Sequence, residues 1–278
     1  MHKVICGWRL RHLREHASLT QKEVAERTGW SQGRITNIES GKSGIPPHRL
    51  DVLLDLYGAD EASRKQCHEQ ALLAEGRAPR DTLRTRFQGD MQLVIDMELS
   101  AQTRWEHASM IIPGLLQTEA YMFNLFRAYR PSLPQNKIEQ DVADRLERQT
   151  VLDNADQRFW FVIDEAALQR MENTGGSRAV LREQIAYLAN AVDRPNIEIQ
   201  VVPFRHGYYL GQAANYVIFG YDTNPPVHLV YLESYDDRDT LHDAIKVGKY
   251  LTLWDHQKAA ALGPEQTRSF LRGMARSS

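Results

Sequence analysis

Three side chains within positions 32–37 carry hydrogen-bonding groups of the kind that read the edges of nucleic-acid bases. Gln32 and Asn37 carry amides, and each amide pairs a donor with an acceptor as adenine requires. Arg34 carries a guanidinium, whose N–H donors suit the O6 and N7 acceptors of guanine. Such side chains can read bases only when one exposed face presents them together, which depends on the helices around them.

Two short helices are predicted on either side of a turn. Thr20 is a suitable N-cap, and Glu23 three residues later completes a capping box. Gly29 ends this first helix at a position suited to left-handed backbone. Ser31 can cap the second helix, which carries the three polar side chains. An earlier helix is expected over 8–19, with Leu10, Leu13 and Ala17 at helical spacing and Arg9, Arg11 and Arg14 on other faces.

The small and aliphatic residues around the turn have the spacing of a DNA-binding helix-turn-helix. Ala25 is small where one helix would meet the backbone of the other, and Gly29 follows four residues later. Ile35 and Ile38 then come six and nine residues beyond the glycine. An ordinary helical hairpin matches a few of these positions but seldom all. We therefore predict a DNA-binding module, with Trp30 as an apolar anchor in the turn.

This stretch resembles the xenobiotic-response-element type of helix-turn-helix, which has the fold of phage repressors. The following segment is similar to the closing region of that family, with a Gly-ended recognition helix and a helix started by proline. It also carries an aliphatic stripe of Leu50, Leu53, Leu54 and Tyr57. Thr28 departs from the family pattern, which usually has a larger aliphatic residue there.

The resemblance implies which residues contact DNA. On the recognition helix, Gln32, Arg34 and Asn37 would face base edges, and Gly33 would let the backbone approach closely. Residues at the start of the preceding helix are suited to phosphate contacts through backbone N–H groups and side chains. For each residue the alternative is an exposed polar side chain without a contact, and that alternative is strongest for Lys42. The predicted DNA-binding set is Thr20, Gln21, Ser31, Gln32, Gly33, Arg34, Asn37 and Lys42, with Arg11 a weaker phosphate candidate.

The charge distribution is compatible with this prediction. Residues 1–58 hold nine basic and six acidic residues, a net charge of +3, whereas the whole chain is at −2. A mildly basic module on an acidic body is typical of a nucleic-acid reader joined to something else, although random unevenness produces such offsets too. Helix-turn-helix modules usually bind two-fold sites as dimers, so a homodimer is expected.

The rest of the chain is predicted to be one α+β unit with a mixed sheet. A helix over 61–79 is the expected bridge, and the predicted domains are 1–78 and 79–278. Apolar runs with β-branched and aromatic content predict strands over 103–112, 158–164, 196–204, 215–221 and 227–234. Helices are predicted over 90–101, 117–129, 134–153, 165–168, 177–192, 239–262 and 263–275. The helix over 117–129 is expected to bury Tyr121, Leu125, Tyr129 and part of Phe123.

Several stretches of this unit resemble a second family, the C-terminal domain of a large group of actinobacterial regulators. They include "IIPGLLQTEAY", "FVIDEAALQR", "PNIEIQVVPF", "HGYYLGQAANYVIF" and "AALGPEQTRSFL". That family is regarded as antitoxin-like, and its members are commonly encoded beside a small protein thought to be their partner. The resemblance implies a regulator whose C-terminal domain binds such a partner.

No catalytic constellation is predicted in the second unit. Asp164 and Glu165 end a strand, but an acidic pair that favours the following helix dipole explains them more simply. His206, His228 and Glu233 match no metal-ligand spacing, so neither a metal nor a cofactor is expected. The Gly-punctuated loop "FRHGYYLG" could instead form the wall of a pocket or partner surface, against the alternative of a plain packed loop. The candidate ligand or partner residues are Trp160, His206, Tyr208 and Tyr209.

Composition excludes several classes of protein. The apolar runs are too short to cross a membrane, and no secretory signal pattern opens the chain. Cys6 and Cys67 form no CxxC pair, which disfavours a disulfide framework or a zinc site. A cytoplasmic, nucleoid-associated protein that is not an enzyme is expected.

Two hypotheses for the second unit remain open. In the first, it binds a small protein that changes the affinity of the chain for its operator. In the second, it holds a small-molecule pocket, and a deep apolar cavity ringed by Trp160, Tyr208 and Tyr209 would favour that alternative. In either case the effector changes DNA binding only by its different affinity for the bound and free forms.

Overall fold

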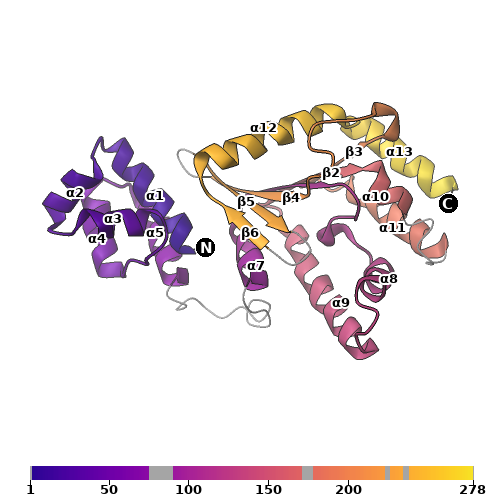
Figure 1. Cartoon of the computed structure of the whole chain (residues 1–278), viewed down its shortest axis with the longest axis horizontal. Helices are drawn as coiled ribbons and strands as arrows, with labels where there is room; N and C mark the ends of the chain where they lie inside the picture. Colours follow the sequence, from indigo (N-terminus) through magenta and orange to yellow (C-terminus); the bar gives the residue numbers. More distant parts are fainter. Residues whose placement is uncertain (1, 75–89, 171–177, 223–225, 234–237, 278) are drawn as a thin grey trace. The chain divides into compact units, whose positions relative to one another are not determined.

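The computed structural model describes residues 2–74, 90–170, 178–222, 226–233 and 238–277 (Figure 1). The chain divides into two compact units, one of residues 1–97 with 222–227 and the other of 98–221 with 228–278. The boundary predicted at 78/79, including Gly76 and Pro79, lies outside the described residues and stays a prediction. None of the described helices is both long and apolar enough to span a membrane.

The first unit has the predicted all-α character, and its helix ends confirm the expected caps. Its helices are α1 (His2–His16), α2 (Gln21–Thr28), α3 (Gln32–Glu39), α4 (Pro47–Leu56), α5 (Glu61–Ala74) and most of α7 (Asp90–Ser100). Thr20 and Glu23 form the reciprocal capping box at the start of α2, and the Gly29 backbone has a φ of 70° at its end. The Ser31 side chain accepts the backbone N–H of Arg34 and so caps α3.

The core of this unit lies on the predicted apolar stripes. Ile35 and Ile38 of α3 are buried, as is the stripe on α4. Each buried aliphatic side chain contributes roughly 1.5–3 kcal/mol by leaving water. Thr28, the departure from the family pattern, donates its hydroxyl to the Val24 carbonyl at 2.7 Å. The hydroxyl is thereby satisfied at the end of α2, which explains why a polar residue is tolerated there.

Helix α1 begins at His2, earlier than the predicted start at 8, because its first turns pack against the end of α3. A Cβ at Gly7 would lie 2.9 Å from the Glu39 carbonyl oxygen and closer still to that of Ile38. Gly41 has a φ of 72°, and a Cβ there would lie 2.6 Å from the Val4 Cα. The backbones of α1 and the α3 terminus therefore approach more closely than side chains would allow.

Both cysteines lie in this core and should report its unfolding. Cys6 is 3% exposed and Cys67 is fully buried, and both thiols are free. Burial raises the pKa of both thiols, that of Cys67 to about 11. We expect an aromatic disulfide reagent at pH 8 to leave the folded chain unmodified and to titrate both cysteines in urea. Rapid reaction of either thiol in the folded chain would contradict the packing of α1 on α5.

Because the pKa of both thiols is raised in the folded chain, the stability of this core should decrease at high pH. An unfolded thiol has a pKa of about 8.5, so the unfolded chain loses its thiol protons first as the pH rises. Stability from the two thiols is therefore fully present below about pH 8.5 and decreases toward pH 11, where Cys67 ionises in the folded chain.

The second unit is built around a six-stranded mixed sheet. The strands are β1 (Thr103–Ala108), β2 (Arg158–Asp164), β3 (Ile197–Val202), β4 (Tyr216–Tyr221), β5 (Val227–Glu233) and β6 (Arg238–Leu241), in the order β3-β2-β1-β4-β5-β6. β1, β2 and β3 are parallel, whereas β4 runs antiparallel to β1 and β6 antiparallel to β5. This confirms the α+β class and the mixed sheet.

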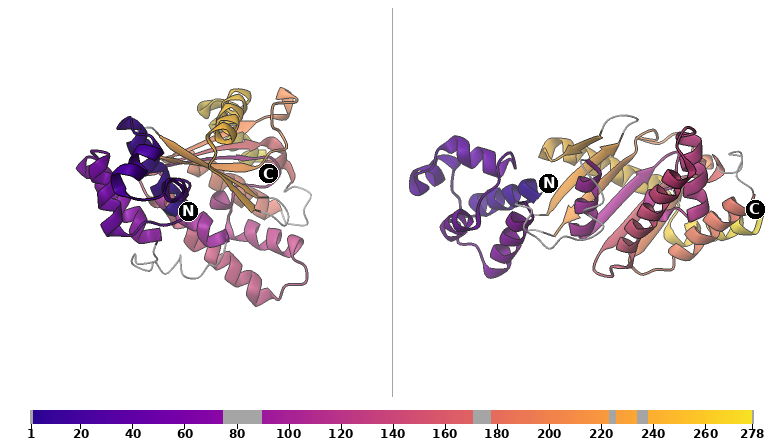
Figure 2. Two further views of the ribbon diagram at one scale, coloured as in Figure 1. Left: turned by 60° about the vertical axis from the view of Figure 1, so that its left-hand side comes forward. Right: turned by 90° about the horizontal axis from the view of Figure 1, so that it is seen from below.

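Helices cover both faces of this sheet. The helices of this unit are α8 (Glu119–Tyr129), α9 (Gln135–Gln149), α10 (Glu165–Gln169), α11 (Arg178–Ala191), α12 (Ala244–Ala260) and α13 (Pro264–Ser277), among the described residues. Figure 1 shows α12 over one face and α8 to α11 over the other, and Figure 2 shows the strands fanning out across the sheet. Phe159 and Phe161 face the core shared with α11 and α13, whereas Val162 faces Trp254 of α12.

Two expectations for this unit were wrong. The helix predicted over 239–262 begins only at Ala244, because Arg238–Leu241 pairs with β5 as an edge strand. Tyr129 is 62% exposed, because it lies at the last turn of α8; Met122 and Phe126 are buried on that helix, together with the predicted Tyr121.

Candidate nucleic-acid interface

The N-terminal part of α3 presents the polar side chains that the sequence predicted to read bases. Gln32, Gly33 and Asn37 are exposed, and Arg34 is half-buried. Within the described parts of the chain, the side chains of Gln32, Arg34 and Asn37 make no hydrogen bond or ion pair. A Cβ at Gly33 would meet nothing within 4 Å. This face of the helix therefore offers unengaged donors and acceptors beside a backbone that can be approached.

A buried ion pair holds α3 in place from behind. Arg14 of α1 donates to both carboxylate oxygens of Glu39, at 2.6 and 2.9 Å, and to the Leu19 carbonyl at 2.8 Å. The hydrogen bond to Glu39 raises the pKa of Arg14. Both side chains are less than a tenth exposed. A buried bidentate pair of this kind fixes an orientation as well as a distance.

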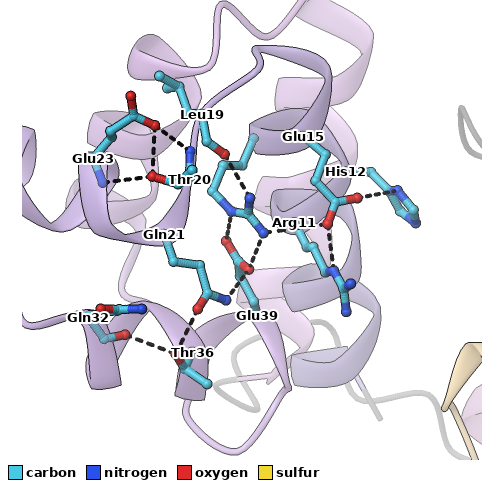
Figure 3. Close-up of polar contacts among 11 residues, drawn as sticks. Arg11, His12, Glu15, Leu19, Thr20, Gln21, Glu23, Gln32, Thr36 and Glu39 are labelled. Atoms are coloured by element: carbon cyan, nitrogen blue, oxygen red, sulfur yellow. Dashed lines mark hydrogen bonds and ion pairs between the residues drawn. The ribbon is translucent and has the colours of Figure 1, made fainter.

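Gln21 extends this network from α2 to α3 (Figure 3). Its amide nitrogen donates to Glu39 at 2.8 Å, and its amide oxygen accepts the Thr36 hydroxyl at 2.9 Å. Thr36 lies on α3 between the predicted base-reading residues, and its hydroxyl also lies 3.0 Å from the Gln32 carbonyl oxygen. The Gln21 side chain thus sets how α2 meets α3, whereas its first-turn N–H is the group suited to a phosphate.

The other predicted phosphate contacts differ in how available they are. The Thr20 hydroxyl and backbone N–H both donate to the Glu23 carboxylate at 2.7 Å, which holds the pKa of that carboxyl below its usual range. A phosphate approaching Thr20 would meet this negative charge. Ser31 is exposed but its hydroxyl caps α3, and Lys42 is exposed in the segment after α3. The Lys42 side chain is therefore more available to a phosphate than the Thr20 side chain, whose main role is to cap α2.

Sequence reasoning missed the supporting network. Arg14, expected on a face other than the core, lies four residues after Leu10 and so shares its buried face. An arginine at a core-facing position signals a buried acid, because an unpaired charge there would be costly. Nothing in the local spacing identifies Glu39 as that acid, since it lies 25 residues away.

The candidate residues of the second unit do not ring one cavity. Tyr208 is 97% exposed, and His206 is exposed beside Tyr209, so neither lines an enclosed space. The indole N–H of Trp160 donates to Gln200 at 2.8 Å. The Tyr209 hydroxyl donates to Asp164 at 2.7 Å. The observation that would have favoured a small-molecule pocket is thus not found at these residues.

The Tyr209 hydroxyl instead connects the 204–214 loop to strands β1 and β2 of the sheet, through its contacts with His107 and Asp164. His107, which no sequence motif identifies, lies 3.1 Å from the Tyr209 hydroxyl, and burial lowers the pKa of its imidazole. Asp164 also accepts the Ala166 N–H and caps α10, as the helix-dipole interpretation of the acidic pair implies. Phe204 and Leu210 remain more than half exposed on this fastened loop, as does Tyr208. Across the described ranges, no group of three or more His, Cys, Asp or Glu side chains is placed to hold a metal ion.

Comparison with known proteins gives two family matches. A model described as "Domain of unknown function (DUF5753)" matches residues 91–273, and one described as "Helix-turn-helix domain" matches residues 6–66. No curated protein and no solved structure matches the chain. The helix-turn-helix match supports the predicted regulator of the xenobiotic-response-element type, whereas the antitoxin-like resemblance stays a prediction.

Proposed function

The chain belongs to the DUF5753 family and carries the helix-turn-helix domain of a DNA-binding transcriptional regulator, and from this premise we propose that α3 reads a specific operator. One observation carries the proposal: Gln32, Arg34 and Asn37 lie on the outer side of α3, whose orientation is held by a buried ion pair. Their amide and guanidinium groups can pair with adenine and guanine in the major groove. The proposal assigns no catalytic step, cofactor or metal to the chain.

Loss of the Arg34 side chain should weaken operator binding and relax its selectivity. We expect Arg34→Ala to cost about 1–3 kcal/mol in specific binding and to lose preference at one base step. The operator is obtained first, by selecting duplexes from a randomised library with the full-length chain. Affinity is then measured on the recovered duplex and on its single-base variants.

A matched control separates base reading from loss of charge. Arg158→Ala removes one exposed positive charge from the second unit, and it should leave the base preferences unchanged. If the selection recovers no common sequence, α3 is not a reader and the proposed function fails. If Arg34→Ala keeps every base preference, the proposed docking of α3 is wrong.

We also propose that a small protein partner controls operator binding through the second unit. The 204–214 loop supports this proposal, because it exposes Phe204, Tyr208 and Leu210 while Tyr209 holds it to Asp164. An apolar surface that is already ordered loses little conformational entropy when a partner binds.

Native mass spectrometry of the full chain from its own cells would identify a partner, with which operator binding is then titrated. Tyr208→Ala should weaken partner binding and leave DNA binding of the free chain unchanged; equal partner affinity would reject this surface.

The alternative is a one-component regulator with a small-molecule pocket in the second unit. A bound metabolite in the same native mass spectra would favour it over a partner protein.

Homodimerisation is proposed for either case, since helix-turn-helix modules usually meet two half-sites one helical turn apart. Analytical ultracentrifugation showing one chain per full operator would reject the dimer.

A further inference from the structure

Arg34 has an aromatic neighbour, Trp30, in the turn before α3. The guanidinium carbon of Arg34 lies 4.7 Å from the centroid of the Trp30 ring. Trp30 is half-buried and packs against the core of the helix-turn-helix unit. The Trp30 ring is therefore held by the core while Arg34 lies over it.

The backbone of Arg34 is held as well. Its N–H donates to the Ser31 hydroxyl at 3.2 Å in the cap of α3, and to the Ser31 carbonyl at 3.0 Å. The guanidinium makes no hydrogen bond or ion pair within the described part of the chain. An arginine over an aromatic face keeps its N–H donors at the edge of its plane, where a base or phosphate can accept them. Contact with Trp30 thus restrains the side chain without occupying its donors.

We infer that Trp30 is a positioning residue for base recognition, which holds the Arg34 guanidinium ready to pair with guanine. A free arginine loses much rotamer freedom when it binds, and a side chain already restrained loses less. Trp30 contributes to operator affinity through Arg34, in addition to anchoring the turn. The inference rests on the proposed function, because it needs α3 to read bases.

A double-mutant cycle on the selected duplex tests the inference. Trp30→Leu keeps an apolar anchor but removes the ring, and it should lower operator affinity about tenfold in the wild-type background. In the Arg34→Ala background the same change should cost less than about twofold, because no guanidinium remains to be positioned. Trp30→Leu should also relax preference at the base step that Arg34→Ala affects. Trp30→Phe retains a π face and should recover part of the lost affinity.

Two controls show whether a Trp30 variant loses operator affinity because it is unfolded or because Arg34 is no longer positioned. Protection of Cys6 and Cys67 from thiol reagents shows whether each variant keeps a folded helix-turn-helix core. In the free protein, NMR should show Arg34 side-chain protons shifted upfield by the Trp30 ring, and Trp30→Leu should remove that shift. If Trp30→Leu is unfolded, the cycle is run with Trp30→Phe, whose smaller ring should cause a smaller loss of operator affinity that again requires Arg34.

The outcomes separate this inference from the proposed function. Equal losses for the Trp30 change with and without Arg34 would show that Trp30 acts only through the core, and would overturn the inference. If the Trp30 change lowers operator affinity in neither background, the inference is also overturned. The proposed function would still stand in that case, provided that operator binding depends on Arg34. Failure to select any operator would reject the proposed function, and the inference with it.

Discussion

Glu39→Ala is expected to destabilise the helix-turn-helix unit by about 3–5 kcal/mol. The change leaves the Arg14 guanidinium less than a tenth exposed and without its bidentate partner. It also removes the acceptor for the Gln21 amide, so α2 loses a contact with α3. Operator binding should fall together with stability, because α3 loses the group that orients it.

Thiol protection measures this effect in the full-length chain. Since both cysteines lie in the core of this unit, their reaction rate follows its opening. A loss of about 3–5 kcal/mol corresponds to a rate increase of roughly two to three and a half orders of magnitude. Glu26→Ala is the matched control, because its pair with Lys22 is 3.9 Å long and both side chains are mostly exposed. That change should cost about 0–1 kcal/mol.

The double variant Arg14→Met/Glu39→Leu separates burial from pairing. Replacing a buried pair with apolar residues of similar volume is often neutral or stabilising, so the double variant should recover most of the loss. Its operator binding should recover less, because Gln21 would still lack its acceptor on α3. A Glu39→Ala chain as well protected as the wild type would show that the pair does not support α3.

Gly7→Ala is expected to destabilise the same unit by about 1–3 kcal/mol, the second large effect. The new methyl group would lie 2.9 Å from the Glu39 carbonyl oxygen and closer to that of Ile38. Both are backbone atoms at the end of α3, so relief requires one helix to move away from the other. The displacement should also weaken operator binding, because α3 carries the base-reading residues.

The chain supplies its own control for Gly7→Ala. Gly33→Ala makes the same change in a helix, but its new methyl group would meet nothing within 4 Å. It should stabilise the unit by up to about 1 kcal/mol, because alanine loses less backbone entropy than glycine. Thiol protection again reports both variants. Equal stability of the two would show that α1 does not pack closely on α3.

Much of the first unit could be predicted from local spacing. The capping box at Thr20, the left-handed Gly29 and the Ser31 cap depend on groups at most a few residues apart. The apolar stripe through Ile35 and Ile38 follows from the helical repeat. In the second unit, the continuous apolar run of 159–163 predicted a buried strand, and β2 does bury side chains on both faces of the sheet. These features are readable because the interactions that decide them are close along the chain.

The candidate interface could be predicted only in part. Spacing and residue type identified Gln32, Arg34 and Asn37, which the structure places on an exposed part of α3. The Gln21 side chain, predicted to contact phosphate, forms hydrogen bonds with Glu39 and Thr36. Whether a polar side chain is free depends on what folds against it, and residue type does not reveal that.

The amino-acid sequence by itself determined the helix-turn-helix, its caps and the residue types that α3 presents. Only the tertiary structure decided that Arg14 pairs with Glu39, that Gly7 lies against the end of α3, and that Tyr209 reaches Asp164. It also decided the strand order and the conversion of 238–241 into an edge strand. The physical reason is that local elements follow from hydrogen bonds and side-chain repeats within a few residues. Pairing across the fold depends instead on which distant groups remain unsatisfied when the chain collapses.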